Sequence, residues 1–255
     1  MRNVVAVFRL IGFILGSCIF VPWAWIMREL RGGMNVDSAK LFHKMACIAF
    51  GIKVRIIGQP RDHAVTPTVF ISNHLSYLDI LVLGSHLNAR FVAKAEVADW
   101  PVFGTFAKTQ RTIFIERTKT ALEGAKDLIG DAVRDNFNVI LFAEGTSTDG
   151  RSAKPFKAGL FEMLYEGRVN AMVQPVAIVI ERAGGKKPDD QSVRDLYAWY
   201  KPEDTLAPHL WAFAKAGGAT IAVHYLPVLD PGQFADRKGI AAATTASVAQ
   251  VLASQ

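Results

Sequence analysis

Short apolar runs alternate with stretches of helical periodicity along most of the chain. Runs rich in β-branched and aromatic residues predict strands at Lys53–Ile57, Thr68–Ile71, Arg90–Ala93, Thr112–Ile115, Val139–Phe142, Met172–Ile180 and Thr220–Tyr225. Helices are predicted from about Ser76, whose hydroxyl could cap the first turn, and at Val97–Lys108, Ala121–Arg134 and Gly159–Tyr165. Because strands and helices alternate, we expect an α/β fold with a single mixed sheet flanked by helices.

The N-terminal segment has a different pattern. Leu10–Met27 contains no charged residue, and arginines flank it at Arg2, Arg9, Arg28 and Arg31. These 18 residues are marginal for crossing ~30 Å of hydrocarbon, and Trp23 and Trp25 suit a membrane interface. Ser38–Ile52 predicts a second short apolar helix. Two adjacent apolar helices favour a monotopic two-helix membrane anchor at residues 1–50 over a single span, although a span stays possible.

A secretory signal peptide is the other interpretation of this segment, but no small-residue cleavage site follows the apolar core. No internal repeat or linker interrupts residues 51–255. We therefore expect one catalytic α/β domain after the anchor.

Two stretches late in the chain carry less information. Lys186–Asp190 is expected to be a surface loop. Trp199–Trp211 mixes aromatic residues, proline and charge. We interpret it as a partly buried connection in preference to a second membrane-contacting element.

Composition narrows the range of partners. The chain has 29 Lys and Arg against 23 Asp and Glu, a formal net charge of +6, which suits a membrane surface or a phosphate-bearing substrate. It has no RNA-binding signature, zinc-finger spacing or arginine-rich tract, so no nucleic-acid partner is expected. Cys18 and Cys47 lie in apolar surroundings without disulfide or metal-site spacing. This favours the cytoplasmic (inner) membrane, with the active site facing the cytosol.

Polar residues follow three of the predicted strands. In an open α/β sheet, functional residues gather at the carboxyl ends of strands, and three such ends deliver Asn73-His74 with Asp79, Glu116-Arg117, and Glu144-Gly145-Thr146. Each set alone is ordinary, because loops often begin with polar residues. His74 lies five positions before Asp79. A histidine can accept a hydroxyl proton near neutral pH, and a carboxylate fixes its tautomer and stabilises the imidazolium.

In their order and spacing, these residues make the chain resemble the glycerolipid acyltransferases of the 1-acylglycerol-3-phosphate acyltransferase type. The resemblance extends over Gly51–Ile180 and is carried by four motifs: Asn73, His74 and Asp79; Gly104 with Phe114-Ile115-Glu116-Arg117; Glu144-Gly145-Thr146; and Val173-Gln174-Pro175-Val176. Lys94, in Ala93-Lys94-Ala95-Glu96, and Pro101 also fit the family pattern.

The resemblance implies transfer of a fatty acyl chain to the free hydroxyl of a lysolipid at a membrane. The donor would be an acyl thioester of acyl-carrier protein or coenzyme A, without a metal or other cofactor. His74 and Asp79 would be catalytic. The expected substrate-binding residues are Asn73, Lys94, Glu116, Arg117, Glu144, Gly145, Thr146 and Pro175.

The third motif departs from the family pattern. Many phosphate-accepting members have proline before Glu-Gly-Thr and arginine soon after it, where this chain has Ala143 and Ser147. Thr146–Gly150 resembles instead a subset that includes lyso-ornithine lipid acyltransferases, and so does the region around Trp199–Trp211. The basic balance and the family's commonest activity favour 1-acylglycerol-3-phosphate as acceptor, with a lyso-ornithine lipid as the alternative. The alternative of another class is a non-catalytic membrane lipid-binding protein. The His74-Asp79 pair argues against it, because a protein that only binds lipid has no evident need for a proton acceptor.

Direct transfer is the expected mechanism, because a thioester is already activated and the enzyme mainly has to activate and align the hydroxyl. An acyl-enzyme is disfavoured, since there is no Gly-x-Ser-x-Gly elbow and both cysteines lie in the anchor region. Arg117 could bind a phosphate with Lys94 as a second cation, and Gly145 would allow close backbone approach. No metal-ligand spacing connects the remaining histidines, which are expected to be structural or solvated: His43, His63, His86, His209 and His224.

Overall fold

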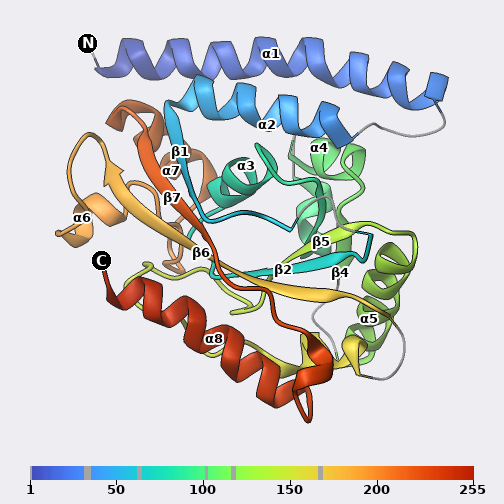
Figure 1. Ribbon diagram of the computed structural model, residues 1–255. Helices are drawn as coiled ribbons and strands as arrows, with labels where there is room; N and C mark the ends of the chain where they lie inside the picture. The colour runs from blue at the N-terminus through green and yellow to red at the C-terminus, as the bar shows by residue number, and fades with distance from the viewer. Residues whose placement is uncertain (1, 32–35, 62–64, 101–102, 116–118, 166–168) are drawn as a thin grey trace.

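The computed structural model describes residues 2–31, 36–61, 65–100, 103–115, 119–165 and 169–255 (Figure 1). In this part of the chain, seven strands form one sheet in the order β1-β7-β6-β2-β5-β3-β4. The strands are β1 (Ile52–Ile57), β2 (Thr68–Ser72), β3 (Ala89–Lys94), β4 (Ile113–Ile115), β5 (Asn138–Phe142), β6 (Met172–Ala183) and β7 (Ala219–Tyr225). All neighbouring pairs are parallel except β6 and β7. The predicted single mixed sheet is confirmed.

Helices cover both faces of the sheet and give each face its own hydrophobic cluster. The helices are α1 (Arg2–Arg31), α2 (Val36–Phe50), α3 (Leu78–Gly84), α4 (Phe103–Thr109), α5 (Lys119–Arg134), α6 (Gln191–Arg194), α7 (Leu206–Ala216) and α8 (Arg237–Ala253). One cluster joins α1, α2, α3 and α7 to the sheet, and the other joins α5 and α8 to it. The central strand β2 is buried along its whole length, which explains its continuous apolar run.

Each predicted strand is present, but two predicted helices and one predicted connection needed correction. The segment predicted as one helix at Val97–Lys108 is a 3₁₀ turn, η1 (Ala95–Asp99), followed by α4. Trp100 between them is extended, as expected for a residue that precedes proline. The predicted helix at Gly159–Tyr165 is a 3₁₀ segment, η2 (Ala158–Leu164). Most of α7 lies in the stretch interpreted as a connection, so half of that stretch is helical.

The helix α8 was not predicted because alanines lie on its exposed side as well as on its buried side, so the two sides differ little in hydrophobicity. Ile240, Ala241, Thr244, Val248 and Leu252 are its buried positions. These positions have helical spacing, but Ala242, Ala246 and Ala253 on the exposed side weaken the apolar period. The side chain of Asp236 caps the helix by accepting from the backbone N–H groups of Lys238 and Gly239.

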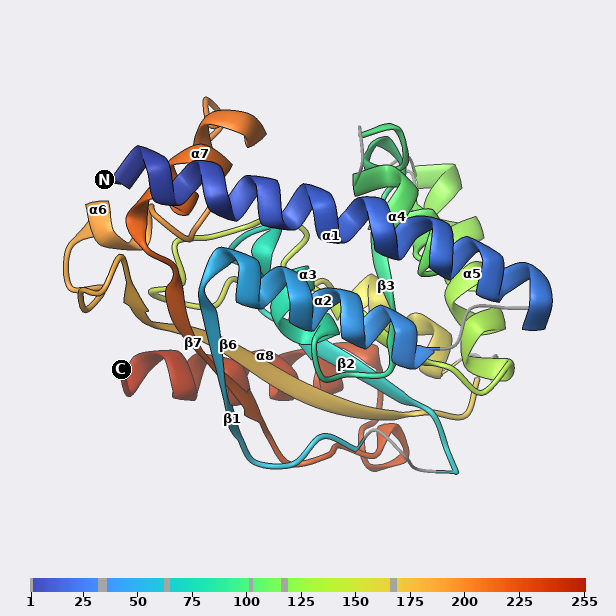
Figure 2. The ribbon, with the colours of Figure 1, turned by 90° about the horizontal axis from the view of Figure 1, so that it is seen from above.

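The N-terminal helix α1 lies across the top of the domain, alongside α2 and, near its own N-terminus, α7 (Figures 1 and 2). It buries Ala6, Phe13 and Phe20, whose seven-residue spacing keeps one side of the helix toward the domain. Large apolar side chains stay exposed along the rest of it, and we call them the apolar face of α1: Val4, Val5, Val7, Phe8, Ile11, Ile14, Leu15, Ile19, Trp23 and Ile26. The side chain of Trp25 lies outside the described residues.

The predicted two-helix anchor is corrected to one helix. Over Arg2–Trp23, α1 is the one helix in the described ranges that is long and apolar enough to cross a membrane. The second predicted helix exists as α2, but it buries Phe42, Ala46 and Phe50 against the core and packs on α3. Its apolar periodicity therefore reflects a core helix, while the boundary at residue 50 between anchor and domain stays a prediction.

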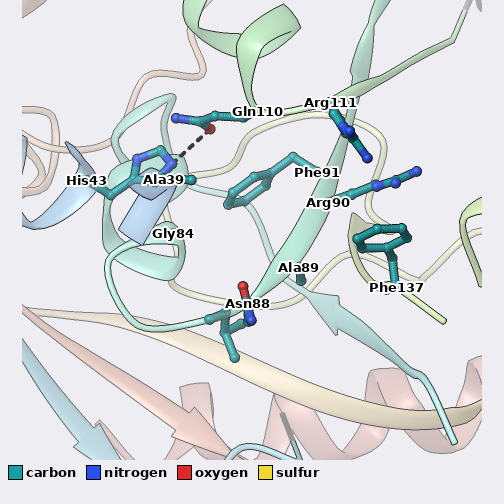
Figure 3. Close-up of a pocket in the computed structure, with 11 residues that line it drawn as sticks. Ala39, His43, Gly84, Asn88, Ala89, Arg90, Phe91, Gln110, Arg111 and Phe137 are labelled. Carbon is teal, nitrogen blue, oxygen red and sulfur yellow. Dashed lines mark hydrogen bonds between the residues drawn. The ribbon is translucent and has the colours of Figure 1, made fainter. Parts of the chain in front are cut away.

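A buried histidine in α2 is held by a side-chain hydrogen bond. Figure 3 shows His43 beside Gln110 at the edge of a small cavity of about 70 Å³, with 2.9 Å between His43 Nε2 and Gln110 Oε1. Across this cavity the Arg90 guanidinium carbon lies 3.5 Å from the centre of the Phe137 ring. Burial lowers the pKa of His43 to about 4, although the bond to Gln110 opposes that shift.

This histidine makes the stability of the protein depend on pH. Because the pKa of His43 is about 4 when folded against an ordinary value of 6.5, the unfolded chain binds a proton in this window that the native chain does not. The free energy of unfolding should therefore fall as pH decreases from 6.5 to 4, by about 3 kcal/mol at most from this group. Denaturant unfolding of detergent-solubilised protein at several pH values measures it.

The matched variant for this measurement is His43→Gln, which keeps a polar partner for Gln110 and does not titrate. Burial also lowers the pKa of His209 and His224, so the variant should retain part of the acid sensitivity. An identical pH dependence in parent and variant would contradict the assignment to His43.

Candidate active site

The loop between β2 and α3 holds a histidine and a carboxylate in direct contact. Nδ1 of His74 lies 2.8 Å from Oδ2 of Asp79, which belongs to the first turn of α3. Because a carboxylate oxygen accepts, Nδ1 carries the proton in the neutral ring and Nε2 is left free to take another. The His74 side chain is 21% exposed, whereas Asp79 is fully buried. The predicted His-Asp pair is therefore assembled as a proton-accepting site.

Four donors surround the Asp79 carboxylate and compensate for its burial. Besides His74, Oδ2 accepts from the backbone N–H groups of Leu75 at 2.7 Å and Ser76 at 2.9 Å. The hydroxyl of Tyr197 donates to Oδ1 at 2.9 Å. Burial, with the nearby Asp79, raises the pKa of Tyr197 well above its ordinary value, so this phenol keeps its proton and donates. The carboxylate is thus fixed in orientation on both of its oxygens.

Glu144, from the third motif, holds the histidine loop through the main chain. Its Oε2 accepts from the backbone N–H of His74 and its Oε1 accepts from that of Lys154, each at 2.8 Å. The backbone carbonyl of His74 accepts from the N–H of Thr148 at 2.8 Å. Glu144 is 4% exposed, and burial raises its pKa while the two backbone bonds lower it. These contacts favour a positioning role over direct substrate binding.

Asn73 and Pro175 also lie behind the site. Asn73 is fully buried, and its side-chain amide donates to the carbonyl of Ile178 at 3.0 Å and accepts from the N–H of Ile178 at 2.8 Å. These two hydrogen bonds clamp the end of β2 to β6, beyond the last paired residues Ser72 and Val176. Pro175 pairs with Ile71 inside the sheet. Neither residue is among the described residues that line the cavity next to His74.

That cavity has a volume of about 730 Å³ and joins the base to the underside of the N-terminal helices. One part is apolar, with Phe13 of α1, Phe42 of α2 and Phe106 of α4 in its wall. The cavity wall also includes charged side chains, which are Lys94, Glu96, Lys157, Lys201 and Asp204. Its size is typical of a small-molecule site. The arrangement suits a molecule with a long apolar chain and a polar end.

The predicted binding residues Lys94, Gly145 and Thr146 line this cavity with His74. Lys94 is 42% exposed and its Nζ lies 3.7 Å from Glu96. Gly145 has a φ of +71°, a conformation that favours glycine, and a Cβ there would collide with the side chain of Lys157. Gly104 of the second motif packs closely on the backbone of Ala98.

The predicted residues Glu116, Arg117, Pro101 and His63 lie outside the described residues.

Three side chains in or next to the candidate site had no signal in the sequence. Tyr197 contacts Asp79 across 118 positions of the chain, from a stretch without a motif. Lys157 follows the third motif but belongs to none of the four. His209 was expected to be structural or solvated, and it is buried with its Nδ1 3.0 Å from the hydroxyl of Tyr77. Tyr197 and His209 reach this region only through long-range folding, so no local pattern could indicate them.

Neither cysteine is among the described residues that line the cavity next to His74. Cys47 is buried, and burial raises the pKa of its thiol to about 12, although a bond to Ser85 opposes this shift. A thiol in such a place is a poor nucleophile. Direct attack by an activated hydroxyl agrees better with the geometry around His74.

Comparison with known proteins places this chain in a family. A family model described as "Acyltransferase" matches residues 53–179. The chain is 35% identical over 238 residues to the lyso-ornithine lipid O-acyltransferase of Brucella abortus, an alignment that covers 88% of this chain and 85% of that protein. It is 27% identical to the 1-acyl-sn-glycerol-3-phosphate acyltransferase of Neisseria gonorrhoeae, with 82% of this chain and 77% of that protein covered.

The fold has a solved counterpart. The crystal structure of the 1-acyl-sn-glycerophosphate acyltransferase from Thermotoga maritima matches with a TM-score of 0.69 at 15% identity, and the match covers 99% of this chain and 96% of that one. This likeness concerns the fold, while the sequence relatives and the motifs around His74 concern the chemistry. The chain therefore belongs to the acyltransferase family.

Proposed function

We propose that this protein transfers a fatty acyl chain from an acyl thioester to the free hydroxyl of a lysolipid, with His74 as general base. One observation carries this proposal. His74, whose Nδ1 is held by the buried carboxylate of Asp79, lines a cavity whose wall has both apolar and charged side chains. An acyl chain fits against the apolar side chains of this wall, and a lipid head group fits against the charged ones.

The chemistry follows from the contacts of His74. Its Nε2 takes the proton of the acceptor hydroxyl while the hydroxyl oxygen attacks the thioester carbonyl carbon. Asp79 stabilises the imidazolium that forms. The tetrahedral adduct then collapses, its carbon–sulfur bond breaks, and the departing thiolate receives the proton from His74. The products are an ester and a free thiol, so proton and electron pairs balance without a covalent enzyme intermediate.

We favour a lyso-ornithine lipid as the acceptor, which was the alternative from the sequence. The Brucella abortus relative bears that name at 35% identity, against 27% for the Neisseria gonorrhoeae glycerophosphate enzyme. Ala143 and Ser147 stand where many phosphate-accepting members have proline and arginine, and this departure also favours a lyso-ornithine lipid. The cavity lining carries both signs of charge, with Lys94 and Lys201 against Glu96 and Asp204. Such a lining suits a head group that has both an ammonium and a carboxylate.

We also propose that the apolar face of α1 lies in the bilayer surface at the cytosolic side of the inner membrane. A helix with exposed apolar residues and flanking arginines binds in the plane of an anionic membrane. Arg2 and Arg9 supply such charges at its start. The donor would then reach the cavity from the cytosol as acyl-carrier protein or coenzyme A thioester.

Offering the purified protein both acceptors, each with both donor thioesters, tests the proposed function. We expect the lyso-ornithine lipid to be acylated with the higher kcat/KM and 1-acylglycerol-3-phosphate with a lower one. A preference for 1-acylglycerol-3-phosphate would reverse the acceptor assignment. Transfer to neither acceptor would contradict the proposed function itself.

A further inference from the structure

The helix α7 has no polar side chain on its exposed side. Its exposed residues are Ala207, Pro208, Trp211 and Ala212, and its buried residues are His209, Phe213 and Ala214. The exposed positions recur after four residues, so they form one stripe, which we call the apolar face of α7. Lys215, in the last turn, is its one basic residue. A helix side that presents only apolar residues is often covered by protein or by lipid.

We infer that α7 is a second membrane-contacting element and that its apolar face lies on the bilayer surface beside α1. This inference rests on the proposed membrane location of α1, and it goes beyond that location by assigning a separate segment of the chain to the lipid surface. It replaces the sequence-based interpretation of Trp199–Trp211 as a partly buried connection.

Continuity with α1 identifies lipid as the occupant. Arg9 of α1 donates to the carbonyl of Ala214 in α7 at 3.2 Å, and both views of the fold place α7 beside the N-terminal half of α1 (Figures 1 and 2). That half carries Val4, Phe8 and Ile11 of the apolar face of α1. The two helices that carry these faces therefore lie side by side, although they are far apart in sequence.

The residue types on α7 suit the boundary between head groups and acyl chains. Trp211 is 36% exposed, and tryptophan is enriched at that depth because its ring is apolar and its N–H is polar. Arg9 bonds to α7 and Lys215 lies in its last turn, and positive charge at these places favours anionic lipid. A helix presented to water would instead carry charged or amide side chains on this side.

The position of α7 gives the contact a consequence for catalysis. Trp199, Lys201 and Asp204 line the cavity and lie just before the helix in the chain. On the buried side of α7, His209 lies 3.0 Å from the hydroxyl of Tyr77 in the catalytic loop and 3.2 Å from the carbonyl of Ala198. A bilayer in contact with α7 therefore holds this cavity wall at head-group level, where a lipid acceptor can enter without crossing water.

The test compares Trp211→Glu with Leu128→Glu in the full-length protein. Leu128 is a large exposed apolar residue, 50% exposed, but it lies on α5, away from α1 and α7 (Figure 1). Partitioning onto vesicles of phosphatidylethanolamine and phosphatidylglycerol is measured at limiting lipid. We expect Trp211→Glu to weaken partitioning roughly tenfold, from the apolar area withdrawn from lipid, and Leu128→Glu to leave it unchanged.

Two further readouts separate lipid contact from other roles of Trp211. Lipids brominated along the acyl chain should quench the fluorescence of the parent more than that of Trp211→Phe. Turnover of the acceptor should fall for Trp211→Glu in vesicles and stay at the parent value in detergent micelles, which also shows that the variant is folded.

Equal partitioning and equal quenching in parent and variants would overturn the inference. A change from dimer to monomer in Trp211→Glu, without a vesicle effect, would also overturn it and assign this face to a second copy of the chain. Because partitioning and quenching require no turnover, failure of the proposed acyl transfer would leave these measurements interpretable.

Discussion

Replacing His74 with alanine should lower kcat/KM for acyl transfer by about 10²–10⁴-fold, the contribution expected of a positioned general base. Without the imidazole, the acceptor hydroxyl must lose its proton to water while it attacks the thioester. Binding of both substrates should change little, because most of the cavity wall comes from other residues. The loss should therefore appear in kcat rather than in KM.

The His74→Ala variant should stay folded, which makes the comparison informative. The backbone bonds from His74 to Glu144 and Thr148 do not involve the side chain. Asp79 would keep the N–H groups of Leu75 and Ser76 and the hydroxyl of Tyr197 as donors. Steady-state kinetics with matched thermal unfolding measures both points.

The matched control is His86→Ala, since His86 follows α3 and is not among the described residues that line the cavity. It should retain the parent activity. Activity in His74→Ala equal to that of the parent would remove His74 from the mechanism.

The second large effect is expected for Asp79→Asn. An asparagine has the same shape, and its carbonyl oxygen can occupy the place of Oδ2 and accept from Leu75, Ser76 and His74. Its amide can then donate to the oxygen of Tyr197. The geometry of the loop is kept, and what is lost is the negative charge that stabilises the imidazolium. A hydrogen bond to a charged group contributes about 1.5–3 kcal/mol, so kcat should fall roughly 10- to 150-fold.

Tyr197→Phe provides the graded comparison. It removes the donor to Oδ1 and leaves the carboxylate charge and its three bonds at Oδ2 in place. Its kcat should therefore lie between those of the parent and Asp79→Asn, with KM unchanged. If Asp79→Asn turned over as fast as the parent, the carboxylate would have no electrostatic role in the reaction.

Strand prediction from the sequence succeeded because each buried strand has a short continuous run of apolar residues. Val139–Phe142 is apolar at every position, and both faces of β5 are covered by helices. The same physics misled the assignment of Ser38–Ile52, because an apolar helix facing the core has the same pattern as one facing lipid. Only the packing of Phe42 and Phe50 distinguishes the two.

For the site, the sequence identified which loops meet but not which way each side chain points. His74, Gly145 and Lys94 face the cavity, whereas Asn73 and Glu144 turn back to bind backbone groups. Polar residues at strand ends serve either purpose, and the choice depends on contacts made after folding. The contact between Tyr197 and Asp79 has no local signature at all.

The clamp between Asn73 and Ile178 has a consequence for how such enzymes can diversify. It fixes the start of the loop that carries His74 to β6 through the side chain of Asn73 and the main chain of Ile178, so the proton-transfer geometry does not depend on which side chain occupies position 178. The cavity residues Lys201 and Asp204 belong to a separate segment near α7. Exchange of that segment between relatives should therefore alter which lipid is accepted while the reaction itself is inherited unchanged, a separation that makes acceptor choice an evolvable trait.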